Sequence, residues 1–172
     1  MDEQHRPGVV RFLIYMITAA GLAGGLAGWI NASGDLAWSQ SLAGPSWSMQ
    51  SDINVISGMF MLQLIAISLW LSQSSGRDGY RTLCTFAILG ILAALFLQLL
   101  AFFGARDLEI AFLAHFGTGI YMIFVSWLVG RCSKAAGYLL WPPLVWQVYH
   151  IALMFELMRL NGDDSLARLA GL

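Results

Sequence analysis

The stretch that decides the fold runs from Leu83 to Ala105 and reads LCTFAILGILAALFLQLLAFFGA. It contains no charged residue. An α-helix rises about 1.5 Å per residue, so about 20 apolar residues cross a hydrocarbon core about 30 Å thick. Leu, Ala and Phe dominate without strict alternation of polar and apolar positions. The stretch therefore predicts a transmembrane helix and not a strand of a membrane barrel.

Four further stretches of similar character flank this one. They run from Phe12 to Ile30, from about Val55 to Ser72, from Ile110 to Gly130 and from Tyr138 to Leu160. The first is longer than the apolar centre of a typical signal peptide, so we interpret it as a retained span. The sequence predicts one integral membrane domain over residues 1–172, an all-α bundle of five transmembrane helices (spans about 12–30, 55–72, 83–105, 110–130 and 138–160).

Composition supports the membrane assignment and excludes other classes. Of the 172 residues, 58% are hydrophobic and 11% are charged, whereas a soluble domain carries roughly 25% charged residues. Intrinsic disorder requires low hydrophobicity and is excluded. The formal net charge of -1 offers no basic excess, so we expect no nucleic-acid partner.

Basic residues predict the orientation. Five spans place Arg6, Arg11, Arg77, Arg81, Arg131 and Lys134 on one side, and Arg106, Arg159 and Arg168 on the other. The positive-inside rule then predicts a cytoplasmic N-terminus and a C-terminus outside, and we expect a bacterial inner membrane. Cys84 and Cys132 fall near the cytoplasmic side, where free thiols are expected instead of a disulfide.

The only long connection is the first loop, residues 31–54, which contains Trp38, Pro45 and Trp47. Large aromatic residues without any basic residue favour a packed loop that covers the outer mouth of the bundle as a lid. The alternative is simple anchoring of Trp in the headgroup layer. In the preceding span, Gly21, Gly24, Gly25 and Gly28 form small-xxx-small patterns, which pack inside the bundle or form a dimer seam.

Polar residues inside the predicted spans are candidates for function, because they are costly in lipid and face the bundle interior. They are Gln63, Gln98, His115, Gln147, His150 and Glu156. Trp146 and His150 lie four residues apart, just after Pro142 and Pro143, and share a helix face that suits a flat apolar ligand. His115 or His150 is a candidate ligand of haem iron; the alternative is an interhelical hydrogen bond. No catalytic motif is present, so an enzyme is not predicted.

Three segments of the chain carry a resemblance to a known family. Residues 38–47, WSQSLAGPSW, resemble the family pattern W-x-x-x-L-x-K-P-x-W, with Gly44 in place of its Lys. Pro142-Pro-Leu-Val-Trp146 and Arg159-Leu-Asn161 resemble its P-Y-x-x-W and R-L-N. Trp70 and Gln98-Leu99 also match family positions. The chain, over residues 10–161, thus resembles the TspO/MBR family (tryptophan-rich sensory protein / translocator protein).

The resemblance implies a cavity beneath the first loop and ligands such as porphyrins, other tetrapyrroles and sterol-like molecules. The candidate ligand-binding residues are Trp38, Pro45, Trp47, Gly58, Gln98, Phe102, Trp146 and His150. Among these, Gly58 and Phe102 replace a family Trp and Asn, and His150 replaces a small residue, so we expect a reshaped cavity.

The resemblance implies a sensor, chaperone or transporter that contacts membrane lipid and requires no cofactor, although porphyrin or haem is a candidate ligand. The alternative is a structural or assembly subunit that reuses the fold, in a homodimer or with partner subunits of a membrane complex. An enzyme that acts on a bound pigment has the weakest support.

Overall fold

The computed structural model describes residues 8–73 and 78–162, and these contain helices and connections but no strand. In chain order the elements are α1 (Val9–Ala32), α2 (Asp35–Ser41), α3 (Ser51–Ser72), α4 (Asp78–Leu99), a π-helical turn η1 (Leu100–Gly104), α5 (Leu108–Cys132), α6 (Lys134–Leu139) and α7 (Trp141–Asn161). Arg6, Arg77 and Arg168 lie outside the described residues, and the orientation derived with them stays a prediction.

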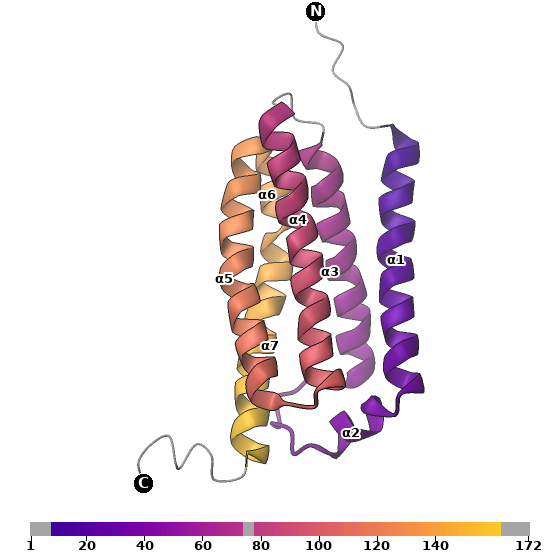
Figure 1. Ribbon diagram of the computed structural model, residues 1–172, viewed down its shortest axis with the longest axis vertical. Helices are drawn as coiled ribbons and strands as arrows, with labels where there is room; N and C mark the ends of the chain where they lie inside the picture. The colour runs from indigo at the N-terminus through magenta and orange to yellow at the C-terminus, as the bar shows by residue number, and fades with distance from the viewer. Residues whose placement is uncertain (1–7, 74–77, 163–172) are drawn as a thin grey trace, which may run out of the picture.

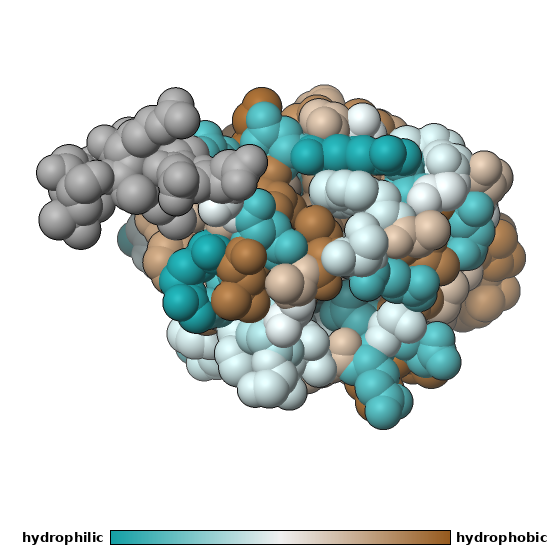
Figure 2. Space-filling model, turned by 90° about the horizontal axis from the view of Figure 1, so that it is seen from below, coloured by the Kyte–Doolittle hydropathy of each residue, from teal (hydrophilic) through white to brown (hydrophobic). Residues whose placement is uncertain are grey.

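The long helices lie side by side along one axis, and α2 lies across one end of the bundle (Figure 1). Helix α3 packs against α1, α4, α6 and α7, while α5 packs against α4, α6 and α7. Helix α1 contacts α3 and α2 and so occupies the edge. Hydrophilic residues are spread over the α2 end of the molecule (Figure 2), as expected where a bundle leaves the hydrocarbon layer.

Four helical segments of the described chain are long and apolar enough to cross a membrane. They are Val9–Ala32, Ser51–Ser72, Tyr80–Gly104 and Leu108–Cys132, which correspond to the first four predicted spans. The all-helical membrane fold is therefore confirmed. Helix α7 has 21 residues but is not among the four, since Gln147, His150 and Glu156 lower its hydropathy. The five-span count stays a prediction.

Local sequence explains where the later helices begin. The Asp107 side chain accepts a hydrogen bond from the Ile110 N–H (2.9 Å), and the Ser133 side chain accepts one from the Ala136 N–H (3.3 Å). Both are N-caps. Pro142 and Pro143 lie in the first turn of α7, where a missing N–H costs nothing. The two prolines therefore mark the beginning of α7 at Trp141.

The main core lies between α3, α4, α5 and α6. Its fully buried side chains include Ile65, Ile88, Ile91, Met122 and Val125.

Helix α6 packs on α5 through backbone instead of side chains. A Cβ at Gly137 would lie 2.6 Å from the Gly130 Cα, and at Gly130 a Cβ would meet the Gly137 Cα at 4.0 Å. The Ser68 hydroxyl of α3 donates to the Ala136 carbonyl at 2.8 Å, which holds a third helix at this crossing.

Two expectations are corrected by the helix contacts. A Cβ at Gly21, Gly24, Gly25 or Gly28 would meet nothing within 4 Å. These glycines therefore do not pack against another helix among the described residues. Cys84 of α4 and Cys132 of α5 are joined as a disulfide, with their Cα atoms 7.5 Å apart. The expectation of free thiols was wrong because α4 and α5 bring the two residues face to face, which the sequence does not show.

Candidate ligand-binding site

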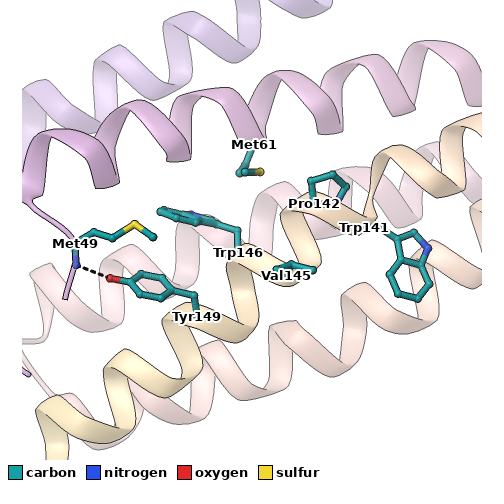
Figure 3. Close-up of a pocket in the computed structure, with 7 residues that line it drawn as sticks. All are labelled: Met49, Met61, Trp141, Pro142, Val145, Trp146 and Tyr149. Atoms are coloured by element: carbon teal, nitrogen blue, oxygen red, sulfur yellow. Dashed lines mark hydrogen bonds between the residues drawn. The ribbon is translucent and has the colours of Figure 1, made fainter. Parts of the chain in front are cut away.

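A cavity of about 470 Å³ lies between α3 and α7 near the end of the first loop (Figure 3). Its lining consists of Met49, Met61, Trp141, Pro142, Val145, Trp146 and Tyr149. None of these residues is charged. Trp, Tyr and Met side chains offer flat and polarizable surfaces, so the cavity is suited to an apolar ligand with a flat face.

Three aromatic rings connect the first loop to the cavity wall. Trp146 stacks on Tyr149 with ring centroids 5.3 Å apart and planes at 26°. The Trp47 ring contacts the Tyr149 ring edge-on, with ring centroids 5.9 Å apart and planes at 76°. Trp47 itself is 48% exposed and does not line the cavity.

The end of the first loop, residues 42–50, is called the lid segment below, and it is fastened to α7 at two points. The Ala43 N–H donates to the Asn161 Oδ1 (2.8 Å), and the Asn161 Nδ2 donates back to the Ala43 carbonyl (2.9 Å). The Met49 N–H donates to the Tyr149 hydroxyl oxygen (3.0 Å), as the dashed line in Figure 3 marks. The lid segment is therefore held by α7.

We expect Asn161→Ala to release one end of the lid segment. The variant loses the paired hydrogen bonds with Ala43, each with a net value of about 1 kcal/mol, so exchange of the Ala43 amide should accelerate about thirtyfold. Hydrogen–deuterium exchange of the protein in detergent measures this rate. The matched control is Asn31→Ala, because the Asn31 Nδ2 donates within α1, to the Ala27 carbonyl. Equal exchange rates of the Ala43 amide in the two variants would show that Asn161 does not hold the lid segment.

Helix α2 is fixed to the chain after η1 by an ion pair. The Arg106 Nε and Nη2 donate to the Asp35 Oδ1 at 3.0 and 2.8 Å, and the Ser33 hydroxyl donates to Oδ2. Two hydrogen bonds hold the pKa of the Asp35 carboxyl below its usual value. The bond from the Ser33 hydroxyl has the larger effect, and the bond from the Arg106 guanidinium has the next largest. Arg106 has a positive φ of 53°, which is costly without a glycine.

Trp38 and Phe102 belong to a second cluster and not to the cavity. Their rings lie 5.2 Å apart, and Phe102 is buried against Phe103 at 4.7 Å. The Arg106 guanidinium lies 5.8 Å from the centre of the Trp38 ring. These contacts fill the space beneath α2 with side chains.

The sequence-derived site residues are thus divided among several places. Of the eight, Trp146 lines the cavity, Trp47 contacts its wall through Tyr149, and His150 lies behind Trp146, with the two rings 4.8 Å apart. Pro45 is half-buried in the lid segment. Gly58 lies on α3 with open space around it, and Gln98 is buried on α4 with no hydrogen-bond partner for Nε2 among the described residues.

His115 of α5 and His150 of α7 form a stacked pair, with ring centroids 5.9 Å apart and planes at 21°. Each Nδ1 lies by the carbonyl of the residue four earlier, Ala111 (2.7 Å) or Trp146 (3.0 Å). A carbonyl only accepts, so Nδ1 carries the proton and Nε2 of the neutral ring is an acceptor. Within the described chain no three His, Cys, Asp or Glu residues cluster as metal ligands. Haem ligation by either His stays a prediction.

The model of the TspO/MBR family matches residues 14–160, which is most of the chain. No curated protein matches.

Proposed function

The chain belongs to the TspO/MBR family and is an integral, multi-pass membrane protein, and from this premise we propose that it binds a planar apolar ligand. The ligand is of the tetrapyrrole or porphyrin class, and its site is the cavity between α3 and α7 beside the lid segment. In this proposal α6 and α7 form a fifth span, the N-terminus is cytoplasmic, and the α2 end faces outward from a bacterial inner membrane. The protein acts as a sensor, chaperone or transporter for its ligand.

The stacked Trp146 and Tyr149 rings beside a charge-free cavity are the observation that carries this proposal. Micromolar binding corresponds to about 8 kcal/mol. At roughly 25 cal/mol per Å², burial of about 330 Å² of apolar ligand surface supplies that amount before the costs of association. Contact of a flat ring compound with aromatic and thioether side chains requires no charge pair.

The proposal is tested by titration of the purified protein in lipid nanodiscs with protoporphyrin, its dimethyl ester and haem. We expect saturable quenching of Trp fluorescence by at least one of these compounds, with one site per chain and a dissociation constant in the micromolar range. Nanodiscs without protein measure partition of the compound into lipid. A signal from all three compounds that rises linearly, as in the empty nanodiscs, would refute ligand binding.

A second candidate function is a structural or assembly subunit, and the glycine face of α1 favours it. The four uncovered glycines allow close approach of another helix. Gentle extraction followed by light scattering distinguishes the candidates, because an assembly subunit remains in a stoichiometric homodimer or complex without any ligand.

A further inference from the structure

The segments of the chain that line the α3–α7 cavity contain no lysine or arginine. No Lys or Arg occurs in residues 12–76, which include α3 and the lid segment, or in residues 135–158, which include most of α7. The Tyr149 hydroxyl, one of the few polar groups of the lining, already accepts the Met49 N–H. The cavity therefore offers no counter-charge to an anionic group.

Among the described residues, the basic side chains nearest the α2 end already form ion pairs. Arg106 pairs with Asp35 at 2.8 Å, and Arg159 pairs with Glu156 at 2.8 Å. An ionised carboxylate moved from water into an apolar site without a partner costs several kcal/mol. The free energy of binding a carboxylic acid in this cavity is reduced by that cost, whereas an ester or an uncharged ring avoids it.

The cavity is open on its α7 side. Val145 of its lining is 65% exposed, and Trp141 and Pro142 are exposed beside it. In the topology proposed above α7 crosses the bilayer, so this side of the cavity faces lipid. On the lid side, the lid segment is attached to α7 at two points, and Met49 of the lining is 43% exposed there.

We propose, on the basis of the function proposed above, that this cavity selects uncharged ring compounds and takes them from the hydrocarbon layer between α3 and α7. A tetrapyrrole binds there as an ester or another neutral form and not as a free dicarboxylate. The ligand is thus a membrane-dissolved molecule, which arrives without passing the lid segment.

The test compares protoporphyrin IX dimethyl ester with protoporphyrin IX, which share the ring and differ in charge. The full chain is reconstituted in phosphatidylcholine vesicles at pH 8, and dissociation constants are expressed as mole fractions in lipid to remove differences in partition. We expect the ester to bind at least tenfold more tightly. If the dicarboxylate binds equally or better, the inference is overturned while ligand binding stands. If neither saturates, the proposed function fails as well.

Two variants test the charge and the route separately. Met49→Lys places a cation at the exposed edge of the lining and should reduce the preference for the ester at least tenfold. Val145→Trp obstructs the gap and should slow association of the ester at least tenfold. Its matched control, Val148→Trp, lies on the same helix, is 58% exposed and lies outside the lining. An unchanged preference in Met49→Lys, or equal association rates in the two tryptophan variants, would contradict the proposal.

Discussion

Replacement of Gly137 by valine is expected to lower the free energy of unfolding by about 3 kcal/mol, at the upper end of the usual cost of overpacking. A Cβ at this position would lie 2.6 Å from the Gly130 Cα, 2.9 Å from the Gly130 N and 3.1 Å from the Ser126 carbonyl oxygen. All three are backbone atoms, so no side-chain rotation relieves the clash. Helix α6 has to move away from α5, and the hydrogen bond from Ser68 to Ala136 is lost with it.

Unfolding in mixed detergent micelles, followed by circular dichroism, measures this effect. The matched control is Gly117→Val, which places the same side chain on α5 at a position where a Cβ would meet nothing within 4 Å. Both variants introduce a β-branched residue into a helix, so the comparison removes the difference in helix propensity. Equal stability of the two variants would show that the contact between α5 and α6 is not tight.

Trp146→Ala is expected to weaken ligand binding about 100-fold, which corresponds to about 2.8 kcal/mol. Buried aromatic anchors account for losses of this size when they are truncated. The variant removes one of the two indole rings of the lining and the stacking partner of Tyr149. Trp47→Ala is expected to change affinity only a few-fold, because Trp47 touches the ring of Tyr149 but not the cavity.

The binding assay for these variants follows absorbance of the porphyrin ester, since removal of a Trp changes protein fluorescence by itself. Trp127→Ala is the matched control: this residue is exposed on α5, packs against the Arg131 guanidinium at 4.0 Å and lies outside the cavity lining. An affinity of Trp146→Ala equal to that of Trp127→Ala would exclude the cavity as the binding site.

The long helices were predictable because hydropathy and length act locally along the chain. The first four predicted spans correspond to helices whose ends differ by a few residues from those expected, for example Val9–Ala32 against 12–30. The shorter features were not predictable in the same way. Helix α2 has seven residues within the first loop, too few for a clear period. The π-turn η1 lies inside a uniform apolar run and leaves no composition signal.

The candidate site was predictable only in part, because a cavity depends on which helix faces meet. Trp146 and Trp47 were found from motif spacing. Met61 gave no signal of its own, since methionine is common in any apolar span. Tyr149 lies three residues after Trp146 and so shares a helix face with it. This spacing is the sequence signal that could have identified Tyr149 as a site residue. Trp38 and Phe102 were assigned to the site because the sequence does not show the tertiary packing, in which Trp38 of α2 contacts Phe102 of η1.

The two attachments of the lid segment, at Tyr149 and Asn161, are twelve residues apart on α7, or about 18 Å along a helix. Trp146, which forms the cavity wall, belongs to the same uninterrupted helix. The lid segment and the α7 side of the cavity wall are therefore joined through one helix. A change in the tilt of α7 would thus displace the lid segment together with Trp146.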